Sequence, residues 1–306
     1  MAADRFAYRL MSPHPLSRII RQFKREPSRT GSLIITFHGD AIVPRGGSVW
    51  LGSLLRFLEL LGTDGGVVRT AVSRLAADGW LEREKVGRKS YYALAPRGRE
   101  RFEAAVEHVY NPHASDEVGQ FELLLIETAA DRESARPALT EAVFGNPFPG
   151  VWVAPPNAVM PSVVAGAIRL HVSAEGEMGR RLVAASWSLD RIADGYRAFI
   201  KTFEPLADGL GRGEVAPDDA ILSRVLLIHH YRRVVLRDPL LPGASLPVGW
   251  PASEARRLCA ALYRALLPAS EQWLGKHGEN QQGALPPPGA ELRRRFSDVP
   301  ANMLQK

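Results

Sequence analysis

The sequence predicts an α+β protein, and three observations lead to this class. In the N-terminal third, an amphipathic helix is followed by a short basic ribbon. In the middle, apolar runs of strand length alternate with a helix-like segment. In the C-terminal third, three segments carry apolar residues at the three- and four-residue spacing of amphipathic helices. A chain of 306 residues has room for two domains or three.

Residues 64–94 carry the most informative pattern of the chain. At about 100° per residue, four apolar residues share one face of the first helix in this segment: Val68, Ala71, Val72 and Leu75. The opposite face carries guanidinium and hydroxyl groups, from Arg69, Thr70, Ser73 and Arg74. Such a helix has a side to bury and a side that can reach phosphates and base edges in a DNA major groove. A solvated amphipathic helix with no ligand is the alternative for this helix alone.

The ribbon that follows has a basic tip, formed by Gly87, Arg88 and Lys89. Helix, break at Gly79 and Trp80, and basic ribbon occur in the order of a winged helix-turn-helix. Arginine can bind guanine bidentately from the helix, whereas the wing is expected to contact phosphate or the minor groove. Six residues are therefore the candidate DNA contacts: Arg69, Thr70, Ser73, Arg74, Arg88 and Lys89.

The segments around this motif supply the rest of such a domain. We expect a buried helix over 32–43, a short strand over 49–51, a helix over 51–62 and a closing helix over 96–110. Thr63 or Asp64 can cap the recognition helix, although Gly65 and Gly66 are poor helix formers in its first turn. A short docked helix is expected before the domain, from the spacing of Leu16, Ile19, Ile20 and Phe23.

Positive charge is concentrated in the part of the chain that carries this motif. Residues 1–110 contain 18 lysines and arginines and 11 acidic residues, a balance of +7. Residues 111–306 contain 21 and 22, a balance of −1. Because attraction to phosphates depends on local basic patches, this distribution favours a nucleic-acid-binding N-terminal domain.

The rest of the chain is predicted to form a small α+β unit and then helices. The α+β unit begins near Gly119, with strands expected in FELLLIET, GVWVAPP and AIRLHVSA. A helix-like segment and a Gly/Pro-rich turn separate the first two of these strands. The later helices are expected over 189–210, 218–238 and 253–276, and the polar, proline-rich end is expected to be disordered.

Several protein classes are disfavoured. The single cysteine, Cys259, excludes an intrachain disulfide, favours a cytoplasmic location and is expected in the core. The charged N-terminus lacks a signal-peptide core, and no run approaches the ~20 apolar residues of a membrane span. No nucleophile elbow, Walker loop or CxxC pair is present, so we expect no enzyme and no cofactor. His229 and His230 point about 100° apart on a helix, so we expect no metal site there.

Two distant blocks of the chain carry a family resemblance. The first contains SLIITFHGDAIVPRGGSVWLGSLL and VVRTAVSRLAADGWLEREKVGRKSYYALAPRGRERF, within residues 31–110. The second contains HHYRRVVLRDPLLPGASLPVGWP and LCAALY, within residues 187–275. In this order, the blocks resemble the PaaX family of bacterial transcriptional regulators, which repress phenylacetate catabolism and related pathways. The segment GNPFPGVWVAPP is similar to the glycine-rich turn and strand of the family.

The resemblance implies an N-terminal winged helix-turn-helix, a central ferredoxin-like (Cas2-like) domain and a helical C-terminal domain. The implied organisation is the winged helix at 29–112, the ferredoxin-like domain at 113–185 and an effector and dimerisation domain at 186–276. Composition adds a basic extension at 1–28 and the tail at 277–306. It also implies a homodimer on partly palindromic, double-stranded operator DNA. The type member is released from DNA by phenylacetyl-coenzyme A, so an acyl-CoA effector is expected.

An acyl-CoA presents phosphates, which arginine binds, and an acyl group, which fits an apolar slot. The effector-binding candidates are Arg232, Arg233, Arg237, Tyr231 and Trp187. The arginines could instead form structural pairs with acids such as Asp238, and the aromatic residues could be plain core.

Two alternative functions stay open at this point. Glu127 and Asp131, near the end of the first strand of the α+β unit, could hold Mg²⁺ in a metal-dependent nucleic-acid-processing enzyme. The other alternative is a DNA-binding protein that senses no small molecule.

Overall fold

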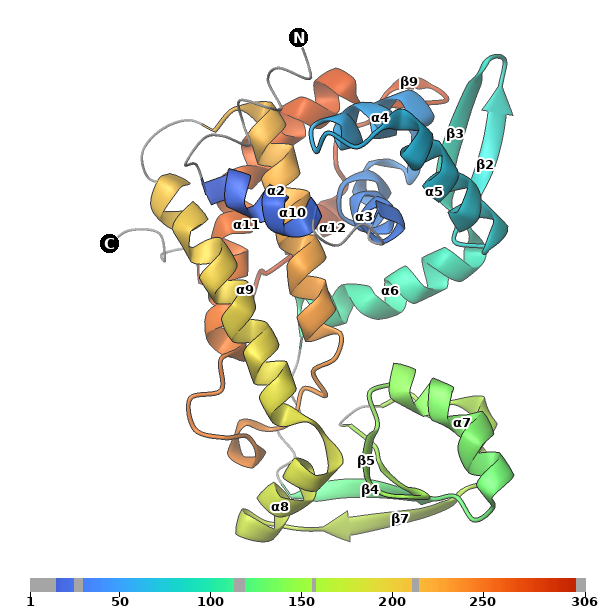
Figure 1. The fold of residues 1–306 in the computed structure, drawn as a ribbon, viewed down its shortest axis with the longest axis vertical. Coiled ribbons are helices and arrows are strands. Elements are labelled where there is room, and N and C mark those ends of the chain that lie inside the picture. The colour runs from blue at the N-terminus through green and yellow to red at the C-terminus, as the bar shows by residue number, and fades with distance from the viewer. Residues whose placement is uncertain (1–14, 25–29, 113–118, 156–157, 211–214, 301–306) are drawn as a thin grey trace. The chain divides into compact units, whose positions relative to one another are not determined.

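The computed structural model describes residues 15–24, 30–112, 119–155, 158–210 and 215–300 (Figure 1). The chain divides into two compact units. Unit 1 comprises Met1–Asn111, Ala198–Arg232 and Glu254–Lys306, and unit 2 comprises Pro112–Arg197 and Arg233–Ser253. Helices combine with small antiparallel sheets, as expected of the α+β class that the sequence predicts.

The N-terminal part of unit 1 contains the elements expected around the basic ribbon. They are α3 (Thr30–Phe37), the π-helical turn η2 (His38–Ile42), the 3₁₀ turn η3 (Val43–Arg45), β1 (Ser48–Trp50), α4 (Leu51–Glu59), α5 (Gly65–Ala77), β2 (Leu81–Val86), β3 (Lys89–Leu94) and α6 (Pro96–Tyr110). The strands form an antiparallel sheet in the order β1-β3-β2. The helix predicted over 32–43 is helical throughout, but its second half has π-helical and then 3₁₀ geometry.

The remaining described elements of unit 1 are helices and one small hairpin. They are α2 (Pro15–Lys24), the second part of α9 (Leu189–Leu210), most of α10 (Pro217–Val235), α11 (Ala252–His277), β8 (Glu279–Asn280), β9 (Gly283–Ala284) and α12 (Ala290–Arg294). The short docked helix is confirmed in α2, whose four apolar residues are all buried. The Phe37 ring stacks on the Phe57 ring at 4.4 Å, and Trp273 of α11 meets Phe57 edge-on at 6.3 Å. These three rings join α3, α4 and α11 in one core.

A buried ion-pair network surrounds Asp40 in η2. Its carboxylate pairs with Arg224 Nε at 2.8 Å and with Arg295 Nη1 at 2.8 Å. The hydroxyls of Tyr110 and Tyr263 donate to the same carboxylate at 2.8 and 3.0 Å. Because an unpaired buried charge costs several kcal/mol to desolvate, these partners are what allow Asp40 to lie in the core.

The prediction that residues 277–306 form a disordered tail is wrong for residues 277–300. Apolar side chains anchor this segment in unit 1: Leu285, Leu292, Phe296 and Val299. The Arg264 guanidinium of α11 also donates to the main-chain carbonyls of Phe296 and Val299. The segment is polar on average, so its composition predicts disorder. A few buried apolar side chains are nevertheless sufficient to hold its backbone in place.

Unit 2 contains a four-stranded antiparallel sheet in the order β5-β6-β4-β7. Its elements are β4 (Gln120–Leu125), α7 (Ala129–Glu141), β5 (Gly145–Phe148), β6 (Val151–Val153), the 3₁₀ turn η4 (Ser162–Val164), β7 (Ile168–Ser173), α8 (Gly176–Ser186), the first part of α9, the end of α10 and the 3₁₀ turn η5 (Gly243–Ser245). Leu124 and Trp152 pack with Leu139 of α7. Phe121 and Val153 alternate to the other face and pack with Val183 of α8.

Two elements of unit 2 differ from the prediction. The Gly/Pro-rich segment expected as a turn contains β5, an edge strand that tolerates Pro147 because an edge can lack one donor. Helix α8 was not predicted, because glycines at its start are poor helix formers. Gly179 is needed there, since a Cβ at this position would lie 2.3 Å from the Ala174 carbonyl oxygen.

The compact units change between Asn111 and Pro112, next to the boundary expected at 112, but they do not change at the boundaries expected at 185 and 276. The segments Ala198–Arg232 and Glu254–Lys306 group with the N-terminal part, whereas Arg233–Ser253 groups with the four-stranded sheet. The expected C-terminal helical region is thus divided between the units. Across the described residues, no helix is both long enough and apolar enough to span a membrane.

Candidate nucleic-acid interface

Helix α5 has the two faces that the sequence predicts. Val68 and Val72 are buried, and Ala71 and Leu75 are half-buried. The four predicted contact residues are all exposed: Arg69, Thr70, Ser73 and Arg74. Because residues three and four positions apart are neighbours on a helix surface, these four side chains form one continuous patch. The exposed face of α5 formed by these four residues is therefore accessible to a ligand.

The start of α5 is well defined despite its two glycines. The Asp64 carboxylate accepts the Gly66 N–H at 2.7 Å, so Asp64 is the cap, of the two residues that the sequence offers. Val67 follows in the first turn and is 51% exposed, on the same side as Thr70 and Arg74. Sequence reasoning missed Val67 because it assigned apolar residues to the core. Its position outside the Val68 face was the available signal, and its methyl groups could contact a thymine methyl.

The basic ribbon is a tight antiparallel hairpin that projects beside α5 (Figure 1). Val86 pairs with Lys89, so Gly87 and Arg88 form a two-residue turn. Gly87 has a φ of +59°, the left-handed region that favours glycine at such a turn. Arg88 is exposed at the tip. Tyr91 and Tyr92 are buried at the base of the hairpin.

Lys89 has an intramolecular partner that the sequence analysis did not anticipate. Its ammonium forms an ion pair with Glu279 of β8 and lies 4.6 Å from the centre of the Trp50 ring. The hydrogen bond to Glu279 raises the pKa of Lys89 above its ordinary value. Of the two predicted wing cations, Arg88 is the one held at the tip, and Lys89 points back to the protein.

The effector candidates do not lie in one unit. Tyr231 and Arg232 belong to unit 1, whereas Trp187, Arg233 and Arg237 belong to unit 2. Tyr231 is buried against the Phe199 and Phe296 rings, at 5.4 and 6.3 Å.

Two more of the candidates have structural contacts. Arg232 donates to the Ser32 carbonyl and hydroxyl oxygens, at 3.0 and 2.6 Å. Trp187 is buried and donates its indole N–H to the Val143 carbonyl at 2.8 Å. Partial burial, and then the charge of Arg237, lower the pKa of Arg233.

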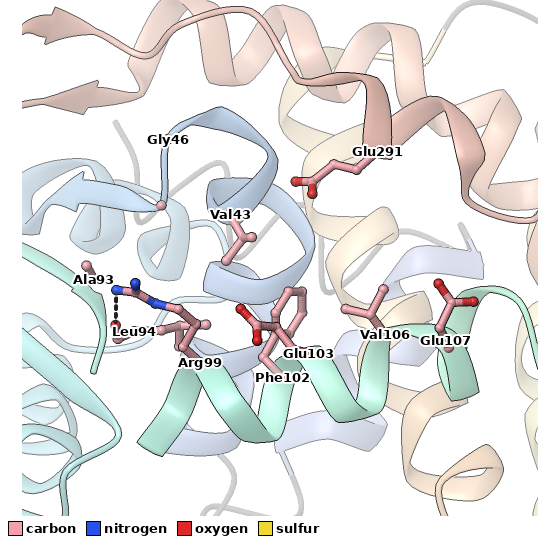
Figure 2. A pocket seen from close by; sticks show the side chains of 11 residues that line it. Val43, Gly46, Ala93, Leu94, Arg99, Phe102, Glu103, Val106, Glu107 and Glu291 are labelled. Carbon is pink, nitrogen blue, oxygen red and sulfur yellow. Dashed lines mark hydrogen bonds between the residues drawn. The ribbon is translucent and has the colours of Figure 1, made fainter. Parts of the chain in front are cut away.

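A cavity of about 430 Å³ lies in unit 1 between η3, α6 and α12 (Figure 2). Val43, Phe102 and Val106 supply apolar surface. Its ionisable side chains are mostly acidic: Glu103, Glu107 and Glu291, with Arg99 as the basic one. Three carboxylates repel phosphates, so this cavity does not suit the diphosphate of a coenzyme A.

The remaining sequence candidates have structural surroundings. Cys259 is fully buried, and burial raises the pKa of its thiol. His229 contacts Thr36 Oγ1 through Nδ1 at 3.0 Å, and the His230 ring packs on Phe203. In the part of the chain that the structure describes, no three His, Cys, Asp or Glu side chains group as a metal site would require.

The two carboxylates proposed for Mg²⁺ gain no support from their geometry. Asp131 lies in the first turn of α7, where its carboxylate and main-chain N–H both bond to the Thr128 hydroxyl. Glu127 contributes its main-chain carbonyl to Arg132 at 2.7 Å. Asp131 thereby takes part in the N-terminal cap of α7.

Comparisons with known proteins identify relatives over most of the chain. Residues 29–98 match the family model described as PaaX-like protein, and residues 187–276 match that described as PaaX-like protein C-terminal domain. The chain is 33% identical over 285 residues to the transcriptional repressor PaaX of Escherichia coli strain K12, covering 88% of this chain and 90% of that protein. Among solved structures, the uncharacterized protein Rv0674 from Mycobacterium tuberculosis is similar at 21% identity and a TM-score of 0.48, covering 72% of this chain and 89% of that one.

Proposed function

The chain belongs to the PaaX-like protein family, and from this membership we propose that it is a DNA-binding transcriptional repressor. Its target would be a catabolic operon for an aromatic acid of the phenylacetate type. One observation carries the proposal: the arginine and hydroxyl side chains of α5 are exposed together above a buried apolar face. A repressor that acts on the chromosome would work in the cytoplasm.

The proposed DNA-binding domain is a winged helix-turn-helix. The order of α3, β1, α4, α5, β2 and β3 supports it, as does the antiparallel sheet in the order β1-β3-β2. In this assignment α5 is the recognition helix and the β2–β3 hairpin is the wing. We also assign unit 2 to the ferredoxin-like class. Its strand order supports this, with η4 in place of the second crossover helix.

Replacement of Arg69 and Arg74 together by alanine tests the recognition face. Each good bidentate arginine–base pair contributes about 1–3 kcal/mol of discrimination, so the double variant should bind its operator at least ~30-fold more weakly. The measurement is a gel shift on a duplex that the wild-type chain enriches from a random-sequence library. Circular dichroism should show an unchanged fold, because both side chains are exposed.

Arg180→Ala combined with Arg181→Ala is the matched control. These two arginines are exposed on α8 in unit 2. The control removes the same charge as the Arg69 and Arg74 variant, so it should keep specific binding. Equal gel shifts for both double variants would contradict the assignment of α5 as the recognition helix.

The proposed effector is an aryl-CoA or acyl-CoA, such as phenylacetyl-CoA, that releases the repressor from its operator. The family resemblance supports this effector, and Arg233 and Arg237, which both belong to unit 2, are the candidates for its phosphates. A ligand at 100 times its Kd stabilises a folded protein by about 2.7 kcal/mol, so phenylacetyl-CoA should raise the melting temperature. Phenylacetate and free coenzyme A are the controls.

Arg233→Gln with Arg237→Gln should reduce that thermal shift and leave operator binding unchanged. If no thioester changes the melting temperature or the gel shift, the chain is a DNA-binding regulator that senses no acyl-CoA.

We also propose a homodimer. Its two recognition helices would contact two operator half-sites about 34 Å apart, which is one turn of DNA. The edge strand β7 supports a contact between copies, since Ile168 and Leu170 are 46% and 42% exposed. Sedimentation equilibrium measures the oligomeric state, and Leu170→Lys should shift it toward the monomer.

A further inference from the structure

We propose that the β8–β9 hairpin is a clamp on the wing, and that Glu279 is its positioning residue. In this assignment Lys89 attaches the wing to the protein and does not contact DNA. The clamp assignment stands on contacts within unit 1. Its consequence for DNA binding rests on the proposed function.

The contacts between hairpin and wing are polar and come from both strands of the wing. Glu279 in β8 pairs with Lys89 in β3. In the turn between β8 and β9, Gln281 Nε2 donates to the Glu84 carboxylate of β2 at 2.5 Å. The Glu279 N–H also donates to Ser53 Oγ of α4 at 3.2 Å. The hairpin thus joins both wing strands to the helix that precedes the recognition helix.

Hydrogen bonds and a buried side chain hold both ends of the β8–β9 hairpin in unit 1. The hairpin begins directly after α11, where the Gly278 N–H donates to the Leu274 carbonyl at 2.8 Å. Leu285 follows the hairpin and is buried, and its N–H donates to the Gly278 carbonyl at 3.2 Å. A Cβ on Gly278 would lie 2.3 Å from Leu285, so the backbone closes tightly at this point. The position of Glu279 is therefore fixed by the core and not by the wing.

The charges at the wing then have separate roles. Lys89 is neutralised by Glu279, and its ammonium lies over the Trp50 ring. Arg88 is adjacent in sequence but exposed at the tip, where a phosphate can reach it. Of these two cations, Arg88 should therefore attract phosphate, while Lys89 and Glu279 determine where Arg88 is held.

Hydrogen exchange of the protein without DNA tests the clamp directly. Lys89→Glu and Glu279→Lys each place like charges together, and together they restore an ion pair with the signs exchanged. A half-exposed ion pair is weak, so amides 83–91 should exchange about two- to fivefold faster in each single variant. The double variant should return to within about twofold of wild type.

Glu254→Gln is the matched control, because Glu254 is an exposed acid at the start of α11, the helix that leads to the clamp. It should leave exchange of amides 83–91 unchanged. Unchanged exchange in both single charge reversals would overturn the clamp.

Binding to the enriched duplex separates the two roles of Lys89. If Lys89 is a clamp residue, the charge-swapped double variant should bind within about threefold of wild type and keep its salt dependence. If Lys89 contacts a phosphate, that variant should show a slope of log K against log salt smaller by about 0.9, and weaker binding. This outcome, with exchange restored, would overturn the assignment of Lys89. A wild-type chain that enriches no duplex would refute the proposed function and leave the exchange result to judge the clamp.

Discussion

Asp40 places a carboxylate within an apolar run, and the arginines that bind it lie far away in the sequence. Arg224 bonds to the Asp40 carbonyl from 184 positions away, and Arg295 pairs with the side chain from 255 positions away. A buried unpaired carboxylate costs several kcal/mol. The helical run around Asp40 is therefore stable in the core only when α10 and the C-terminal segment are also folded.

The two tyrosines on Asp40 predict a loss of stability in alkali. Burial raises the pKa of Tyr263 to about 12, and burial also raises the pKa of Tyr110 well above its ordinary value. The folded state holds these protons more tightly than the unfolded chain, in which tyrosine titrates near 10. The free energy of unfolding should therefore fall as the pH rises from about 10 to about 12.

Urea unfolding at pH values on either side of 10 measures this loss, and phenolate absorbance reports which tyrosines titrate. Tyr263→Phe removes one of the titrating groups and should make the decline shallower. Ordinary titration of all tyrosines in the still-folded protein would contradict the prediction.

At the scale of elements, α6 packs closely on the turn that precedes the wing. Gly98 lies where a Cβ would come within 2.4 Å of the Trp80 carbonyl oxygen. That carbonyl accepts the Ala95 N–H at 3.0 Å, so it cannot move without losing a bond next to α6. The glycine sets the distance between α6 and the base of the wing.

Gly98→Ala should therefore destabilise the protein by about 1–3 kcal/mol, because the new methyl group overpacks a backbone contact. Gly275→Ala is the matched control: Gly275 is exposed in α11, and a Cβ there meets nothing within 4 Å. It should stabilise the protein by about 0.5–1 kcal/mol, the usual gain of alanine over glycine in a helix. Urea denaturation measures both, and opposite signs are expected; the same sign for both would refute the close contact.

At the scale of the whole molecule, unit 1 is assembled from three separate stretches of the chain. The last stretch includes α11, the clamp and α12, and it returns to the network of Asp40 through Arg295. Arg256 supports this return, since its guanidinium donates to the Tyr110 carbonyl at 2.9 Å and pairs with Asp298. The proposed DNA-binding elements thus share one core with the end of the chain.

Two adjacent arginines test this dependence. Arg295 is buried in the network, whereas Arg294 is exposed. Arg295→Gln removes one partner of a buried carboxylate and should cost about 3 kcal/mol or more of unfolding free energy. Arg294→Gln should change it by less than about 0.5 kcal/mol. Equal stabilities in urea would show that the C-terminal segment does not support the core.

Local rules explain which parts of the protein could be predicted from its sequence. The two faces of α5, a cap at Thr63 or Asp64 and the turn at Gly87 all follow from helical periodicity, capping and backbone preference within a few residues. The same rules located α6 and α9 at their observed bounds. The resemblance to the PaaX family, read from two distant blocks, is confirmed by the comparisons.

Contacts between distant groups, in contrast, depend on how the elements pack in three dimensions. Lys89 and Glu279 are 190 positions apart, and nothing in the sequence near Lys89 distinguishes a clamp residue from a DNA contact. The end of the chain has a composition typical of disorder, yet a few buried anchors hold it in place. The periodicity of apolar residues indicates which side of a helix or strand is buried. Which charged side chains pair depends on how separate elements pack against one another, and this packing involves the whole folded chain.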